Sequence, residues 1–297
     1  MATQKKLSVE RARKRAAWVF LAPWLLGLLC FFIVPFIYSV IYSFSDVAIS
    51  SEKIGLSITF KGLFNYNYLF LRDSQFLMTV WDSVAELLYS VPVIFVFSIF
   101  IALLLNQKFK GRGLVRSVFF LPVIIASGVV MKIIQQDVFV QTNMSGSTST
   151  FQTDAISEIL LRAGIPEKVS DIITGVTSGV FDLSWKSGIQ ILLFISALQS
   201  ISPSYYEAAS IEGANGWESF WKITFPLLSP TSMLVIIYSI IDSFTDVSNK
   251  VMESMMERFE HFYYGLASAS AVIYMLAILL VVGLVMLIFR KNVFHNS

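Results

Sequence analysis

The side chains in this sequence that could do chemistry are few, and most are paired carboxylates. Asp242 and Asp246 are four residues apart, as are Asp82 and Glu86, so a helix would place each pair on one face. Such pairs can exchange protons, accept hydrogen bonds or form ion pairs. One Cys and two His, far apart in the sequence, cannot build a disulfide or a zinc site. Phosphate-loop, H-E-x-x-H and G-x-S-x-G motifs are absent, so any ATP used would be hydrolysed by another chain.

The composition indicates a membrane protein. Of the 297 residues, 56% are hydrophobic and only 14% are charged, and the mean hydropathy is +0.70. A soluble domain carries about 25% charged residues, so this chain has too little polar surface to cover a globule of its size. The net charge of +2 gives no support to nucleic-acid binding.

Six stretches are apolar enough to cross a membrane, which takes roughly 20 residues each. The fourth is the weakest, because Trp185, Lys186 and Gln190 make its start polar. The first is too long for a cleaved secretory signal. The sequence therefore predicts an all-α membrane protein, one transmembrane domain over 1–297, with spans at 18–45, 76–105, 114–131, 187–200, 227–247 and 266–289.

The distribution of Lys and Arg predicts the orientation. Six spans would divide the connecting segments and the termini between two sides of the membrane. The side that holds both termini has 13 of the 22 basic residues, although its segments are shorter in total than those of the other side. That side is predicted to be cytoplasmic, so both termini are predicted to lie in the cytoplasm. Residues 1–17 then form a basic cytoplasmic amino end, 202–226 a cytoplasmic loop and 135–185 a long external loop. A short helix is predicted at 154–162 within the external loop.

Segment 202–226 has the pattern of two short helices joined by a Gly/Asn turn. Ser204 with Glu207 three residues later predicts a capping box at the first helix, and Gly213 suits a sharp helix exit. Glu218 and Lys222 are spaced for an i,i+4 ion pair on the second helix. These features alone also fit an amphipathic hairpin lying on the lipid surface.

The same segment resembles the EAA loop of ABC-importer permeases. The residues that carry the resemblance are Glu207, Ala208, Ala209, Gly213, Ile223 and Pro226, with Phe225 where that pattern usually has Leu. The run from Leu198 to Ile201 leads into the loop as in the sugar-transporting branch. The resemblance covers nearly the whole chain except 137–156.

This resemblance implies the type I importer permease fold and the position of a permease half in a bacterial inner membrane. A second homologous permease subunit would complete the path, and a cytoplasmic ATPase dimer would bind the ATP, leaving this chain without a cofactor. An external solute-binding protein would deliver a sugar or oligosaccharide. By this resemblance, the residues that couple the chain to the ATPase are Glu207, Ala208, Ala209, Gly213, Ile223 and Pro226. Ile223 and Pro226 would fix the return of the chain into the fifth span.

Polar residues near the outer ends of the fourth and fifth spans are the candidate solute path. Carboxylates and amides can hydrogen-bond a neutral polyhydroxylated solute, and an indole ring can stack on a sugar face. The alternative is that the two carboxylates form ion pairs with Lys or Arg across a subunit interface, or reach the outer water. The candidates are Asp242, Asp246, Gln190, Ser239 and Trp185.

Three other functions remain as alternatives. A permease for a polyamine, phosphate ester or metal ion would share the fold, although phosphate transport favours basic residues within spans. A free-standing secondary transporter is disfavoured by the lack of an internal repeat. A membrane enzyme is disfavoured by the lack of His and nucleophile groupings.

Overall fold

The structure, a computed structural model, describes residues 16–49, 56–107, 110–111, 113–114, 117, 159–163, 165–246 and 249–289. Nearly all of the predicted third span at 114–131 lies outside the described residues, as do most of the basic amino end and residues 135–158. Of the short helix predicted at 154–162, only 159–162 are described, and these are helical.

Helices dominate the described part of the chain, and four of them are long and apolar enough to cross a membrane. They correspond to the predicted first, second, fifth and sixth spans. A bent helix pair is a fifth candidate and contains the predicted fourth span. Three of them run over Ala16–Ser43, Ser74–Asn106 and Tyr264–Phe289. The remaining candidate span, Ser229–Glu260, contains two helices, over Ser229–Thr245 and Lys250–Glu260, and its residues 247–248 are not described.

The bent pair consists of α9 (Glu167–Lys186) and α10 (Gly188–Ser200), which meet at 59°. The bend falls at Ser187 and Gly188, and Gly/Ser pairs are common sites of sharp kinks. Thirteen residues of α10 reach about 20 Å, less than the roughly 30 Å of hydrocarbon. A crossing at this place therefore needs residues of α9. Helix α9 was not predicted from the sequence, and nearly all of it lies in the interval 135–185 that was assigned to the external loop.

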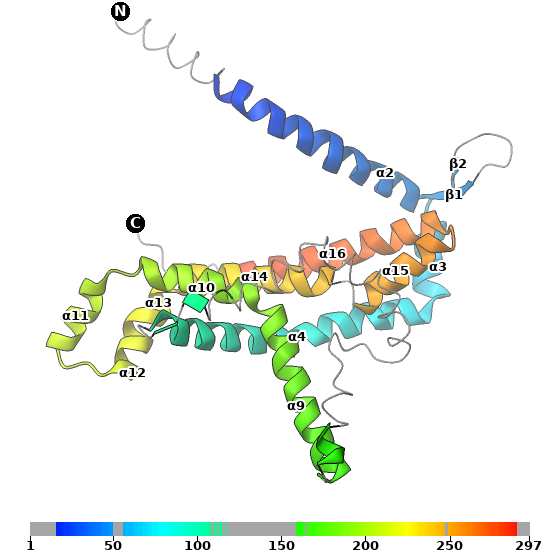
Figure 1. Cartoon of the computed structure of the whole chain (residues 1–297). Coiled ribbons are helices and arrows are strands. Elements are labelled where there is room, and N and C mark those ends of the chain that lie inside the picture. Colours follow the sequence, from blue (N-terminus) through cyan, green and yellow to red (C-terminus); the bar gives the residue numbers. More distant parts are fainter. Residues whose placement is uncertain are drawn as a thin grey trace, which may run out of the picture. The chain divides into compact units, whose positions relative to one another are not determined.

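The chain divides into two compact units. The first takes its described residues from Met1–Trp81 and Lys250–Ala277, and the second from Asp82–Asn249 and Ile278–Ser297. The long helices α4 (Ser74–Asn106) and α16 (Tyr264–Phe289) contribute residues to both. Elements of the first unit are η1 (Leu29–Ile33), α2 (Val34–Ser43), β1 (Ser45–Ile49), β2 (Leu56–Phe60), α3 (Phe64–Leu71) and α15 (Lys250–Glu260) (Figure 1).

A small β-hairpin in the first unit departs from the all-helical prediction. Strands β1 and β2 pair antiparallel, with Ser45 opposite Phe60. The buried Asn65 amide donates to the carbonyls of Ser43 and Ser45, at 3.0 and 2.9 Å. These bonds fix α3 against the end of α2 and the start of β1, where two backbone carbonyls would otherwise be buried without partners.

The second unit has an apolar core built by α4, α10 and α14 (Ser229–Thr245). Phe194 of α10 is fully buried and meets Phe95 of α4 edge to face, with ring centroids 5.5 Å apart. Ile191 and Val235 are also fully buried, and they belong to α10 and α14. This core anchors the segment between α10 and α14, which holds the predicted loop 202–226.

Candidate functional site

The segment between α10 and α14 is a hairpin of short helices. It consists of α11 (Pro203–Ile211), α12 (Gly216–Ser219), the π-helical turn η2 (Phe220–Thr224) and α13 (Phe225–Leu227). Figure 1 shows α11 and α12 at one end of the second unit. The predicted pair of helices with a turn between them is confirmed.

Helix α11 begins differently from the prediction. Its N-cap is Ser202, and no side chain caps it. Pro203 at the first helical position lacks an N–H and has a backbone angle suited to a helix start. Ser204 is therefore already inside the helix, and its hydroxyl lies 2.8 Å from that of Ser202. The predicted capping box of Ser204 and Glu207 is wrong.

The end of α11 agrees with the prediction for Gly213. This residue has φ +80°, in the left-handed region that glycine adopts without strain. The N–H of Ala214 donates to the carbonyl of Ala209 at 2.9 Å, and that of Gly213 to Ser210 at 3.1 Å. This pair of bonds is the Schellman motif, which stops the helix and turns the chain sharply.

The capping box of the hairpin lies at α12. The side chain of Asn215 accepts the N–H of Glu218 at 2.9 Å, and the Glu218 carboxylate accepts the N–H of Asn215 at 3.1 Å. Glu218 also lies 3.5 Å from Lys222, which confirms the predicted i,i+4 pair. The backbone N–H of Asn215, and then Lys222, hold the pKa of Glu218 below its ordinary value of 4.5. Asn215 with Glu218 three residues later was a readable signal that the sequence analysis missed.

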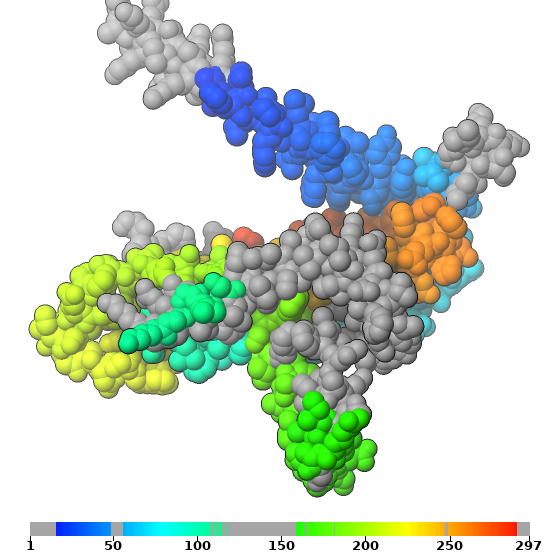
Figure 2. All heavy atoms as spheres, viewed as in Figure 1, coloured from blue at the N-terminus to red at the C-terminus, as the bar shows by residue number. Residues whose placement is uncertain are grey.

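One hydrogen bond joins the two arms of the hairpin, and a cluster of aromatic rings packs within the second arm. The Tyr206 hydroxyl of α11 lies 2.9 Å from the Thr224 hydroxyl of η2, which is 4% exposed. Trp221 packs against Trp217, Phe220 and Phe225, with ring centroids 5.0 to 5.7 Å apart. Figure 2 shows the atoms of this hairpin, in yellow-green and yellow, at one end of the second unit.

The six predicted coupling residues fall into three environments within the hairpin. Glu207, Ala208 and Gly213 are exposed. Ala209 is 8% exposed, so its methyl group faces the interior of the hairpin. Ile223 and Pro226 are half-buried where the chain returns to α14. The face open to a partner therefore contains Glu207, Ala208 and Gly213.

The candidate solute-path residues form two separate contacts in the second unit. The buried Gln190 amide of α10 donates to the Ser239 hydroxyl of α14 at 3.2 Å. Its carbonyl oxygen has no hydrogen-bond partner among the described residues. This oxygen can therefore accept one further hydrogen bond.

The carboxylates of α14 lie in different surroundings. Asp246 is 3.6 Å from the Lys186 ammonium at the end of α9, so an ion pair forms within the chain. Asp242 is exposed, and Trp185 is half-buried beside Lys186. The structure thus joins Gln190 to Ser239 and Asp246 to Lys186.

No group of three His, Cys, Asp or Glu residues able to hold a metal ion occurs within the described ranges. Asp82 and Glu86, the other carboxylate pair, are both exposed.

Comparison with known proteins gives a consistent result. Residues 69–295 match the family described as binding-protein-dependent transport system inner membrane component. The probable ABC transporter permease protein YesP of Bacillus subtilis is 29% identical over 97% of this chain and 93% of its own. The arabinooligosaccharides transport system permease protein AraP of the same organism is 30% identical, over 78% of this chain and 70% of its own.

A solved structure shares the fold. It is the crystal structure of a bacterial alginate ABC transporter in complex with alginate pentasaccharide-bound periplasmic protein, one chain of which superposes with a TM-score of 0.65. The match covers 96% of this chain and 98% of that chain at 18% identity.

Proposed function

The chain belongs to the family of binding-protein-dependent transport system inner membrane components, and from this premise we propose that it is a permease subunit importing sugars or oligosaccharides. A relative named for arabinooligosaccharides and a structural neighbour from an alginate transporter support this substrate class. Membership of a transporter family argues against the membrane-enzyme alternative.

The observation that carries the coupling proposal is the ordered hairpin between α10 and α14. Helix α11 is rigid, because a Schellman motif stops it and the Tyr206–Thr224 contact braces it. A rigid helix with the small, exposed Ala208 on its surface can enter a groove closely and transmit a displacement to the adjoining spans. The proposed partner is a cytoplasmic ATPase dimer that hydrolyses ATP on behalf of this chain.

The proposed assembly places this chain in a bacterial inner membrane with six spans and both termini in the cytoplasm. Residues 1–17 and 202–226 are then cytoplasmic, and 135–185 are external. A second permease subunit would form the other half of the path. A neighbour solved with a periplasmic protein supports delivery of the solute by a binding protein.

The proposed solute path centres on Gln190 and Ser239, because a buried amide with an unused carbonyl among the described residues can accept a solute hydroxyl. The exposed Asp242 and the half-buried Trp185 are placed beside it in this proposal. Asp246 acts through Lys186, since their ion pair fixes the end of α9 against α14.

Ala208→Trp tests the coupling proposal, with Ala208→Ser as the control at the same position. The complete importer, reconstituted in liposomes with binding protein and ATPase, is assayed for uptake of an arabinooligosaccharide and for ATP hydrolysis. An overpacked contact costs about 1–3 kcal/mol, so docking should weaken roughly 5- to 150-fold.

Uptake and solute-stimulated ATP hydrolysis should fall together in the Trp variant and stay at the wild-type level in the Ser variant. Because Ala208 is exposed, the Trp variant should reach normal abundance in the membrane. Full uptake by Ala208→Trp at that abundance would remove α11 from the coupling surface.

A further inference from the structure

A cavity of about 1150 Å³ lies within the first unit. Its walls come from β1, α3, the first turns of α4, α15 and the turn between α15 and α16. Arg72, Lys250, Glu253 and Glu257 are among the lining residues, so charges of both signs face the space. A lining of mixed sign disfavours a strongly ionic ligand, because either charge would meet groups of its own sign. A neutral polar ligand fits this lining best.

Arg258 fixes one wall of this cavity. Its guanidinium donates to the Ser270 hydroxyl at 2.7 Å and to the Asp73 carboxylate at 2.6 Å, and it lies 5.0 Å from the Phe76 ring centroid. Asp73 also accepts the N–H of Phe76 at 3.0 Å, at the start of α4. This ion pair is satisfied within the protein and mostly buried. It therefore shapes the wall and leaves ligand contacts to the other lining residues.

Phe262 lines the same cavity in an unfavourable backbone conformation. Its φ of 65° is the only positive value at a non-glycine position in the described residues. The end of α15 repeats the bonds at the end of α11, with Tyr263 N–H to Arg258 at 2.9 Å and Phe262 N–H to Phe259 at 3.1 Å. At the end of α11 the equivalent position is Gly213.

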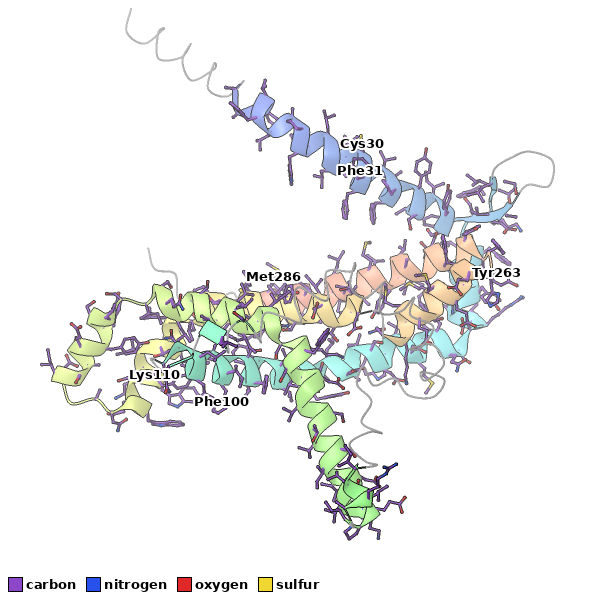
Figure 3. All side chains as sticks on the ribbon, viewed as in Figure 1. Cys30, Phe31, Phe100, Lys110, Tyr263 and Met286 are labelled. Atoms are coloured by element: carbon purple, nitrogen blue, oxygen red, sulfur yellow. The ribbon has the colours of Figure 1, made fainter. Side chains whose placement is uncertain are left out.

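Glycine would satisfy the backbone at position 262 better than phenylalanine, since bulky residues are disfavoured in the left-handed region. The local backbone therefore gives no reason for a bulky residue here; the ring of Phe262 meets that of Tyr264 edge to face, with centroids 6.1 Å apart, and the residue is 57% exposed at the cavity. Strained residues of this kind cluster where a side chain serves a ligand. Figure 3 shows this turn, marked by the adjacent Tyr263.

We infer that this cavity is a binding site for a neutral oligosaccharide, with the Phe262 ring as its stacking surface. The inference rests on the proposed function as a sugar permease. An aromatic ring packs against the apolar face of a sugar, while carboxylates accept hydrogen bonds from its hydroxyls. Glu253 and Glu257 supply such acceptors, and Arg72 supplies donors to hydroxyl oxygens. In the proposed topology the site is external and would hold a solute apart from the path at Gln190.

The test compares Phe262→Gly with Phe259→Ala in the full chain in lipid nanodiscs. Phe259 is a matched control, because it is also 57% exposed and contacts Tyr264 but does not line the cavity. Neutral arabinopentaose and anionic trigalacturonate are the probes, and binding is measured by saturation-transfer NMR. A third variant, Phe262→Tyr, keeps the ring.

Arabinopentaose should bind wild type, Phe259→Ala and Phe262→Tyr alike, and Phe262→Gly about 2- to 12-fold more weakly. The melting temperature of Phe262→Gly should equal or exceed that of wild type, because the backbone strain is relieved; this separates lost binding from lost folding. Equal binding by Phe262→Gly, preference for trigalacturonate, or no binding by wild type would each overturn the inference.

Uptake of arabinopentaose by the complete importer is measured in parallel. Uptake by an importer whose permease chain does not bind the probe would overturn this site alone and leave the proposed function standing. Binding at the cavity without uptake would support the site and count against the proposed function.

Discussion

Gly265 lies where the first turn of α16 meets the backbone of β1. A Cβ added there would overlap the carbonyl oxygen of Ser45 and come within 2.9 Å of the Asn65 side-chain nitrogen. Asn65 cannot move away without breaking its bonds to two carbonyls. Gly265→Ala should therefore lower the free energy of unfolding by about 1–3 kcal/mol, measured by thermal unfolding of the purified protein.

Gly283 of the same helix is the control for this substitution. Nothing lies within 4 Å of a Cβ added at Gly283, so Ala there should leave the stability unchanged or raise it by up to about 1 kcal/mol. Equal melting temperatures for the two variants would contradict the close contact at Gly265.

Glu218 makes the order of the hairpin depend on pH. Its pKa is lower in the folded hairpin than in the unfolded chain, because the carboxylate accepts the Asn215 N–H and faces Lys222. The stabilisation is therefore complete above the ordinary value of 4.5 and disappears as the pH falls through the lower, folded value. The protection factors of the amides at residues 215–218, which are the exchange rates corrected for the pH dependence of an unstructured peptide, should fall below pH 4.5 in a series from pH 7 to pH 3. Glu218→Gln should exchange faster at pH 7 and lose most of this dependence.

The two candidate capping boxes show what the sequence can predict at single residues. Ser204 with Glu207 and Asn215 with Glu218 both fit the spacing, but only the second forms. With Pro203 as the first helical residue, the N-cap of α11 is Ser202, two residues before the predicted Ser204. Gly213 was predicted correctly because a left-handed exit demands a residue without a Cβ. The inward orientation of Ala209 depends on the packing of the opposite arm, which no local pattern records.

At the scale of elements, the contact between the Tyr206 and Thr224 hydroxyls joins the two arms of the hairpin. Tyr206→Phe removes one hydroxyl and keeps the ring, leaving Thr224 only a 3.4 Å contact to the Ser219 carbonyl. A lost hydrogen bond costs about 1 kcal/mol, so local opening should become roughly 5-fold more frequent. Hydrogen exchange at Gly213 and Ala214 measures this opening.

Tyr205→Phe is the matched control for the hairpin, because Tyr205 is the exposed neighbour on the same helix. Its amide exchange should equal that of wild type. If both variants exchange at the wild-type rate, the contact between hydroxyls does not hold the arms together.

The elements that were predicted best are those with long apolar runs. Helices Ser74–Asn106 and Tyr264–Phe289 match their predictions within a few residues, since a span must be apolar along its length. Helix α9 was missed because it has no continuous apolar stretch. Polar residues such as Lys168, Asp171 and Asp182 interrupt its apolar residues. The β-hairpin was missed because its pairing joins residues up to 15 positions apart.

At the scale of the whole molecule, the proposed topology places the α11–α13 hairpin and the α15–α16 turn on opposite sides of the membrane. The candidate span Ser229–Glu260 separates them in the chain. If its apolar part, α14, crosses the bilayer, the segments before and after it cannot share a side. The bias of Lys and Arg predicts that the hairpin is on the cytoplasmic side.

Single-cysteine labelling decides this topology. The two variants are Ile211→Cys on α11 and Glu260→Cys at the end of α15, and both positions are exposed. They are introduced into a Cys30→Ser chain, because Cys30 is itself exposed and would react. A membrane-impermeant maleimide should label position 260 in cells whose outer membrane alone is permeable. It should label position 211 only after the inner membrane is opened. Labelling of 211 but not 260 in such cells would invert the proposed topology, and with it the contact between α11 and an ATPase. Labelling of both would mean that α14 does not cross the membrane.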